Sequence, residues 1–203
     1  MGFHPQLFDS LDNDGWAMCD DAIPTDWHQS LLQNSQALWQ AGLFTPAGIG
    51  RNASHIKNAA IRGDCIHWVD TAQPGYAAHP FFLWTEQLRS ALNQRYFLGL
   101  RSAEFHFTLY PPGQRYLKHL DQHQSNKHRK ISMVLYLNAD WSADDGGELC
   151  LFGPDDEALP IKRILPKTGR LVVFRSDLIP HEVLPATRDR WSLSGWLRTD
   201  EPL

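Results

Sequence analysis

Two histidines and one aspartate are arranged in this chain as the ligands of a metal ion could be. His119 and Asp121 are separated by one residue, and His181 follows much later in the sequence. Two imidazoles and one carboxylate form the facial triad of non-haem Fe(II) sites, which leaves coordination positions open for other molecules. Arg190 comes shortly after His181, and a guanidinium suits a dicarboxylate because it can pair with a carboxylate through two hydrogen bonds. The pattern predicts an oxygenase with an acidic co-substrate.

A competing metal site could be built from His119 and His123, which are four positions apart. On a helix, this spacing binds zinc when a glutamate follows the first histidine. Leu120 stands in that place, and the turn-forming residues 111–113 lie just upstream, so we reject a helical zinc site. The His-X-Asp pattern alone arises easily by chance in a chain with ten histidines. The iron prediction therefore depends on the elements that position these residues.

The chain after residue 102 has the pattern of short β-strands, in which apolar and polar residues alternate. The predicted strands cover residues 103–109, 131–137, 149–152, 161–165, 171–174, 181–184 and 191–197. Turn signals such as Asp144-Asp145-Gly146-Gly147 separate them. Many short strands at regular spacing are typical of a sandwich or barrel, and a jelly-roll barrel is the best match.

The first hundred residues are mixed and mainly helical. The predicted elements are strands at 16–19 and 66–69, a helix from the N-cap Thr25 to about Ala41, and a helix at 81–97. The apolar residues of 43–60 follow neither a helix nor a strand period, which predicts a long loop. Loops of this length more often have a function than not.

These elements predict an α+β protein whose core is a double-stranded β-helix (jelly-roll) with the N-terminal helices packed against it. We expect residues 1–203 to form one domain. Residues 1–101 would supply helical support and a substrate loop, and residues 102–203 the catalytic core.

Strand geometry makes the triad possible, because side chains two residues apart on a strand point to the same face. His119 and Asp121 could then both point into the barrel while Leu120 packs outside. We expect His181 to come from a strand of the opposite sheet.

Arg190 lies near the start of the last predicted strand and shares parity with Ser192, Ser194 and Trp196. If one of these side chains points into the barrel, all of them do. The small serines would leave room for a co-substrate beside the metal.

Composition narrows the class of protein. The net charge of −4 and the pI near 6.2 give no field that attracts polyanions, so we expect no nucleic-acid partner. The three cysteines lack a Cys-X-X-Cys pair, which suits a reducing compartment. No secretory signal and no apolar run of membrane-spanning length is visible. We expect a soluble cytoplasmic protein without a membrane partner.

Several short motifs carry a resemblance to a known family. They are Arg62-Gly63-Asp64-Cys65-Ile66-His67-Trp68, Tyr110-Pro111, Tyr116-Leu117-Lys118-His119-Leu120-Asp121, Tyr136-Leu137-Asn138, Gly146-Gly147-Glu148-Leu149, Pro180-His181-Glu182-Val183 and Arg190-Trp191 through Trp196. Over roughly residues 62–198 the chain resembles the 2-oxoglutarate- and Fe(II)-dependent dioxygenases, specifically the prolyl hydroxylases of the hypoxia-inducible-factor type and their bacterial relatives.

The resemblance implies a role for each candidate residue. His119, Asp121 and His181 would bind Fe(II). Arg190 and Tyr136 would hold the distal carboxylate of 2-oxoglutarate, and Tyr110 would lie alongside this co-substrate. The residues that match substrate-contacting positions are Arg62, Asp64, Arg129 and Trp196. The loop at 43–60 would close over the substrate.

The implied reaction is hydroxylation of a substrate C–H by O2, with 2-oxoglutarate converted to succinate and CO2 and with ascorbate as a possible further cofactor. A protein bearing the target proline would be the partner, with prolyl 4-hydroxylation of elongation factor Tu as the first candidate, and we expect a monomer. Two alternatives remain open: a dioxygenase for a different residue or a small molecule, and a non-catalytic metal-binding or oxygen-sensing module. A nucleic-acid demethylase is less favoured because position 196 is Trp.

Overall fold

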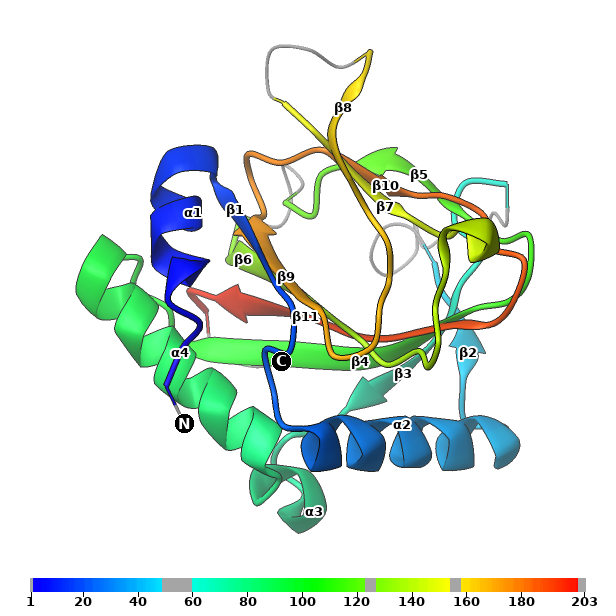
Figure 1. Ribbon diagram of the computed structural model, residues 1–203. Helices are drawn as coiled ribbons and strands as arrows, with labels where there is room; N and C mark the ends of the chain where they lie inside the picture. The colour runs from blue at the N-terminus through cyan, green and yellow to red at the C-terminus, as the bar shows by residue number, and fades with distance from the viewer. Residues whose placement is uncertain (1, 49–59, 123–126, 154–157, 201–203) are drawn as a thin grey trace.

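Two antiparallel sheets face each other in the computed structural model, which describes residues 2–48, 60–122, 127–153 and 158–200 (Figure 1). The larger sheet runs in the order β1 (Trp16–Cys19), β9 (Leu171–Arg175), β6 (Arg129–Tyr136), β11 (Arg190–Arg198), β4 (Ser102–Tyr110), β3 (Cys65–Val69) and β2 (Thr45–Pro46). The smaller sheet runs in the order β5 (Tyr116–His119), β10 (His181–Val183), β7 (Leu149–Phe152) and β8 (Pro160–Ile164). This arrangement confirms the predicted jelly-roll core. The larger sheet takes strands from both halves of the chain.

Helices cover the outer face of the larger sheet (Figure 1). They are α1 (Gln6–Asp14), α2 (Thr25–Gln40), the short α3 (Pro74–Ala77) and α4 (Pro80–Tyr96). A separate 3-10 turn, η2 (Ala143–Asp145), precedes β7 in the sequence. On α4, Phe81 and Leu88 are fully buried and share one core cluster with Phe105 and Phe107 of β4. Burying an apolar side chain of this size stabilises the fold by about 1.5–3 kcal/mol. The helices therefore hold the sheet that forms the floor of the site.

The two faces of β4 have different chemistry. Phe105 and Phe107 pack toward the helices, whereas His106, Thr108 and Tyr110 line a cavity on the opposite face. The period of two along a strand produces this separation. A single strand thus contributes to the core and to the candidate site.

Helix boundaries differ slightly from those predicted. Thr25 is the first residue of α2 rather than its N-cap; Pro24 precedes it and makes no side-chain capping bond. The second long helix begins at Pro80, which is tolerated in the first turn because the N–H that proline lacks is not needed there. The His79 side chain accepts a hydrogen bond from the Phe81 N–H (3.2 Å) and caps this helix. α1 and α3 were not predicted.

Two predictions about the strands that carry the metal-ligand candidates are wrong. β5 ends at His119, so Asp121 lies beyond the strand and not on its face. β10 does not belong to the opposite sheet: it pairs with β5, and His181 stands directly across from His119. The two imidazoles are therefore neighbours within one sheet, and their ring centres lie 4.3 Å apart.

The predicted loop at 43–60 is only partly described. Its first residues form β2, which pairs with β3, and residues 49–59 lie outside the described residues. The expected closure of this loop over a substrate remains a prediction.

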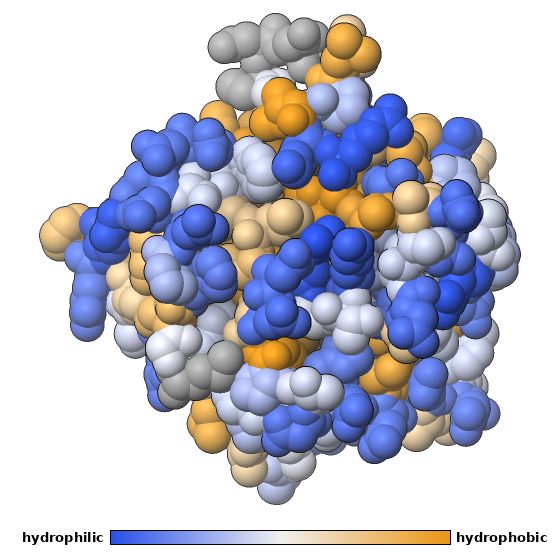
Figure 2. Space-filling view, in the orientation of Figure 1, coloured by the Kyte–Doolittle hydropathy of each residue, from blue (hydrophilic) through white to orange (hydrophobic). Residues whose placement is uncertain are grey.

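The surface offers few further clues to function. On the face shown in Figure 2, hydrophilic residues predominate, and apolar surface gathers near the hairpin of β7 and β8, where Leu159 and Ile161 are exposed. Among the described residues, no helix is both long and apolar enough to cross a membrane. Cys19, Cys65 and Cys150 are all free.

Candidate active site

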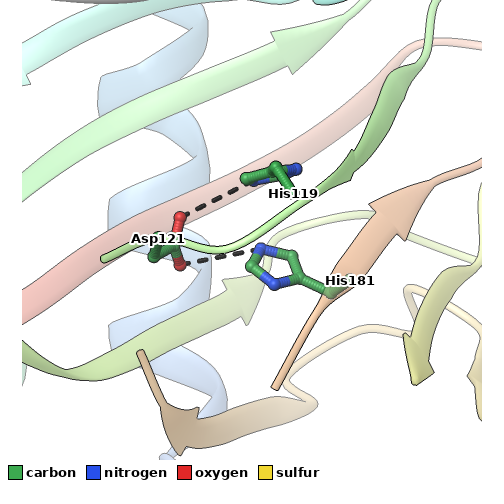
Figure 3. Close-up of side chains that lie close together, drawn as sticks. All are labelled: His119, Asp121 and His181. Atoms are coloured by element: carbon green, nitrogen blue, oxygen red, sulfur yellow. Dashed lines mark ion pairs between the residues drawn. The ribbon is translucent and has the colours of Figure 1, made fainter. Parts of the chain in front are cut away.

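His119, Asp121 and His181 converge on the wall of a cavity of about 650 Å³. Figure 3 shows both imidazoles directed at the carboxylate, each toward a different oxygen. The His119 Nε2–Asp121 Oδ1 and His181 Nε2–Asp121 Oδ2 distances are both 3.6 Å. One ligand atom from each residue lies within 4.8 Å of the others. Two nitrogens and one oxygen at this spacing can hold one metal ion and leave its remaining positions open.

Backbone carbonyls fix the orientation of both imidazoles. His119 Nδ1 lies 2.8 Å from the Leu117 carbonyl oxygen, and His181 Nδ1 lies 3.1 Å from that of Ile179. A carbonyl only accepts hydrogen bonds, so each Nδ1 carries the proton and each Nε2 keeps its lone pair. Metal-binding histidines use the same arrangement, in which the outer nitrogen bonds to a carbonyl or carboxylate. Both Nε2 atoms are thus prepared to act as ligands.

The charge states also suit a metal site. Burial alone would raise the pKa of Asp121, but the positive charges that His181 and His119 carry when protonated, together with the Ser132 hydroxyl, hold it well below its usual range. Burial, assisted by His119, lowers the pKa of His181 to about 4. A carboxylate and a neutral imidazole are the forms that bind a metal.

Arg190 lines the same cavity. It is a buried cation that has no carboxylate partner among the described residues. Its side chain is 2% exposed, and Nε donates to the Gly147 carbonyl oxygen at 2.8 Å. The guanidinium carbon lies 5.3 Å from the Tyr110 ring centre and 5.0 Å from that of Tyr136. Among the residues that the structure describes, no Asp or Glu forms an ion pair with it. Burying an unpaired charge is costly, which points to an anionic ligand.

Gly147 allows this placement of Arg190. Its φ of +70° is a conformation that L side chains rarely adopt. A Cβ there would stand 2.9 Å from Ala186 Cβ and 3.2 Å from Arg190 Cδ. The glycine therefore lets the chain pass close enough for its carbonyl to accept from the guanidinium.

Two hydroxyl groups near Arg190 are also buried without a partner in the described part of the chain. They belong to Tyr136, which is fully buried, and Ser192, which is 1% exposed. Buried polar atoms are nearly always hydrogen-bonded, so such atoms call for a missing ligand. A cation with two free hydroxyls fits the carboxylate of a dicarboxylic acid, and the neighbouring triad fits the metal that would bind its other end.

Arg62 and Asp64 form a bidentate ion pair beside the triad. Nε and Nη2 of Arg62 donate to the two carboxylate oxygens at 2.7 and 3.0 Å. Burial alone would lower the pKa of Arg62, but Asp64 raises it. The guanidinium carbon lies 4.7 Å from the centre of the Tyr116 ring. This ring stacks on the His119 imidazole, with 3.6 Å between the ring centres. This pair therefore connects β3 to the metal-ligand strand.

Arg129 and Trp196 lie at the other end of the cavity. Six positions separate Trp196 from Arg190 on β11, a distance of about 20 Å along the strand. The Arg129 guanidinium carbon lies 3.5 Å from the centre of the Trp196 ring, and Nε donates to Glu104 at 2.7 Å. Glu104 also accepts from Arg198. This end of the cavity thus presents the Trp196 ring beside arginines that are already paired with a carboxylate.

His106 lies between Trp68 and Trp196 on the cavity floor, with ring centres 5.0 and 5.3 Å away. Burial, together with the Arg62 guanidinium, lowers its pKa to about 3. An unfolded chain would bind the proton near the ordinary pKa of about 6.5. The unfolded state therefore takes up more protons between these values, so stability is lost as pH falls from about 6.5 toward 3.

We expect the His106→Phe variant to lose less stability on acidification than the wild type. Between pH 6 and 4.5 the wild type should lose about 2 kcal/mol more of its free energy of unfolding than the variant does, at about 1.4 kcal/mol per pH unit. Urea unfolding at both pH values measures it. Equal slopes for His106→Phe and the wild type would contradict the expectation.

Some residues at the site were not identified from the sequence. Ser132 donates to Asp121 at 2.7 Å, and Glu104 joins Arg129 to Arg198. Both lie on predicted strands, but their contacts depend on how strands pair, which alternation does not reveal. A charged residue inside an alternating strand, such as Glu104, was the available signal.

Comparison with known proteins identifies the family. Residues 105–198 match the model of the 2OG-Fe(II) oxygenase superfamily. The structure is similar to a prolyl-4-hydroxylase from Pseudomonas putida, with 38% identity, a TM-score of 0.83, and coverage of 96% of this chain and 98% of that one. It is also similar to a prolyl hydroxylase from Trichoplax adhaerens in complex with a hypoxia-inducible-factor peptide, with 26% identity, a TM-score of 0.83, and coverage of 96% and 88%.

A hypoxia-inducible factor prolyl hydroxylase from Caenorhabditis elegans is 32% identical over 200 residues, which include 92% of this chain and 27% of that protein. The chain belongs to the 2OG-Fe(II) oxygenase superfamily and, within it, to the prolyl-hydroxylase type. The cofactors of this family are Fe(II), 2-oxoglutarate and O2. The chain spans 27% of the length of this nematode relative and 44–56% of the length of the Egl nine homolog 1 proteins of human, mouse and rat.

Proposed function

We propose that this protein is a 2-oxoglutarate- and Fe(II)-dependent dioxygenase that hydroxylates a prolyl residue of a protein substrate. His119, Asp121 and His181 are assigned as the iron ligands. The observation that carries the proposal is the buried Arg190 cation, which has no carboxylate partner among the described residues and shares one cavity with the triad. A metal site and a carboxylate site together fit the co-substrate of this family.

The side chains of the pocket would bind and orient this co-substrate. The Arg190 guanidinium would donate to the distal carboxylate, and the Tyr136 hydroxyl, which lacks a partner in the described residues, would donate a further hydrogen bond. Tyr110 forms an aromatic wall beside them. When bound, iron and 2-oxoglutarate supply the activation of O2 that oxidises a C–H group, with succinate and CO2 as products. The protein's task is to orient that C–H group and to exclude competing reactions.

The far end of the cavity is assigned to the substrate. Arg62 and Asp64 lie near the triad, whereas Trp196 lies further along β11 and carries Arg129 of β6 against its ring. Because the charges of these arginines are matched by carboxylates, they suit an uncharged segment of a protein better than a small anion. The names of the similar solved structures, a prolyl-4-hydroxylase and a prolyl hydroxylase with a bound peptide, support proline as the target. Elongation factor Tu is the first substrate to test, and a cytoplasmic monomer is the proposed form.

Mass spectrometry of the proteome tests this function. Comparison of cells with and without the gene should reveal a proline that gains one oxygen atom only when the protein is present, and the purified protein with Fe(II), 2-oxoglutarate and ascorbate should restore it. A His119→Ala protein serves as the control and should not restore it. Turnover of 2-oxoglutarate with oxidation of a different residue or a small molecule would refute the proline assignment. Metal binding without any turnover would indicate a non-catalytic module.

A further inference from the structure

Asp121 is held in place by hydrogen bonds to the opposite sheet. β5 ends at His119, so no strand pairing fixes the residues that follow. The next residue, Gln122, donates its backbone N–H to the Ser176 carbonyl oxygen at 3.0 Å. The Asp121 carboxylate accepts from Ser132 Oγ at 2.7 Å. Ser132 lies on β6 and Ser176 directly follows β9, and both strands belong to the larger sheet.

The two serine hydroxyls also contact each other. Ser132 Oγ and Ser176 Oγ are 2.8 Å apart, and the residues are 1% and 0% exposed. The Ser176 backbone N–H donates to the Lys130 carbonyl oxygen at 3.0 Å, which ties it to the start of β6. The hydroxyl pair therefore rests on backbone that is itself fixed at two points.

The chemistry of the groups determines which hydroxyl donates. An ionised carboxylate only accepts hydrogen bonds, and a serine hydroxyl has one proton to donate. Ser132 gives its proton to Asp121 Oδ2, so its oxygen can only accept from Ser176. The chain then runs from Ser176 to Ser132 to Asp121, and hydrogen bonds in such a chain strengthen one another.

This chain selects one orientation of the carboxylate. The terminal torsion of an aspartate has a broad, roughly two-fold preference, so an unsupported carboxylate can rotate. The bond from Ser132 fixes Oδ2, and Oδ1 then faces His119 Nε2 at 3.6 Å. Both oxygens are thereby held in place opposite the two imidazoles (Figure 3).

We propose that Ser132 and Ser176 are positioning residues that orient Asp121 for metal binding. The proposal rests on the assignment of Asp121 as a metal ligand under the proposed function. Partners that orient a metal ligand commonly change metal affinity by about 10- to 100-fold. Ser132 touches the carboxylate and should have the larger effect, whereas Ser176 acts through Ser132 and should have an effect of a few-fold.

Titration of the purified, metal-free protein with Co(II), followed by the visible absorption of the bound ion, tests the proposal without any turnover. Ser132→Ala should weaken Co(II) binding by about 10- to 100-fold and alter the absorption band. Ser132→Thr keeps a hydroxyl and should restore both. Ser35 is a matched control because it is also fully buried, yet its hydroxyl has no partner among the described residues. Ser35→Ala should bind Co(II) as the wild type does.

The outcomes separate this proposal from the proposed function. If the wild type binds Co(II) no better than His119→Ala does, the triad is not the metal site and the function fails. If the wild type binds and Ser132→Ala binds equally well with an unchanged absorption band, only the positioning role is overturned. Should Ser132→Ala fail to fold, as circular dichroism would show, Ser176→Ala decides: unchanged affinity contradicts the proposal.

Discussion

Replacing His119 by alanine is expected to abolish conversion of 2-oxoglutarate to succinate. The variant removes one of three ligand atoms that lie within 4.8 Å of one another. Loss of a partner that merely orients a ligand costs about 10- to 100-fold in metal affinity, so loss of a ligand should cost more than about 100-fold. Succinate release, measured with saturating 2-oxoglutarate and a fixed Fe(II) concentration, checks this result.

His4→Ala is a suitable control for this variant, because His4 lies near the N-terminus and does not line the cavity. It should retain wild-type turnover. His119→Ala should remain folded, because His119 is only partly buried and its Nδ1 bonds to the carbonyl of Leu117, two residues away. Substantial turnover by a folded His119→Ala protein would refute the triad assignment.

Replacing Arg190 by methionine is expected to prevent 2-oxoglutarate binding without destabilising the ligand-free protein. Truncating one partner of a buried, hydrogen-bonded charge pair costs about 2–5 kcal/mol, which corresponds to roughly 30-fold to several thousand-fold in affinity. In the ligand-free protein, the same change removes a buried cation that lacks a carboxylate partner among the described residues, so its melting temperature should stay equal or rise. Thermal melting with and without 2-oxoglutarate measures both effects.

Arg190→Lys and Tyr136→Phe sharpen this test. Lysine keeps the charge but lacks the planar fork, so affinity should fall less than with methionine. Tyr136→Phe deletes a buried hydroxyl without a partner in the described residues, which should weaken 2-oxoglutarate binding and leave the ligand-free protein as stable as before. The account fails if Arg190→Met melts well below the wild type and is still stabilised by 2-oxoglutarate.

The stability cost at this site is a consequence of its function. Among the described residues, Tyr136 and Ser192 bury hydroxyl groups that have no partner, and Arg190 buries a cation that has no carboxylate partner. Such groups destabilise a fold, and they persist where a ligand completes them. Apolar substitutions at these three residues should therefore leave the free protein as stable as the wild type or more stable, and should weaken co-substrate binding.

Alternation along strands made much of the fold predictable. Phe105 and Phe107 alternate with His106 and Thr108, and this period of two assigned β4 correctly and separated its core face from its cavity face. The same rule predicted that Ser192 would share a face with Arg190, and both line the cavity. Strand positions follow from local sequence because burial on one face imposes the pattern.

Strand pairing was not predictable in the same way. No local pattern indicates that β10 lies beside β5, so His181 was expected on the opposite sheet. Asp121 was expected on a strand, but its position depends on Ser132 and Ser176, which lie on or beside strands of the other sheet. Contacts between residues distant in the sequence are set by the packing of the two sheets, and a single sequence does not specify them.

Crystals grown without O2 in the presence of Mn(II) and 2-oxoglutarate provide the most direct test of the site. Anomalous diffraction at the manganese edge should place one metal ion between His119 Nε2, His181 Nε2 and the Asp121 carboxylate. Electron density for 2-oxoglutarate should extend from this ion, with its distal carboxylate on the Arg190 guanidinium. A metal ion bound away from the triad, or a co-substrate carboxylate that does not reach Arg190, would contradict the account.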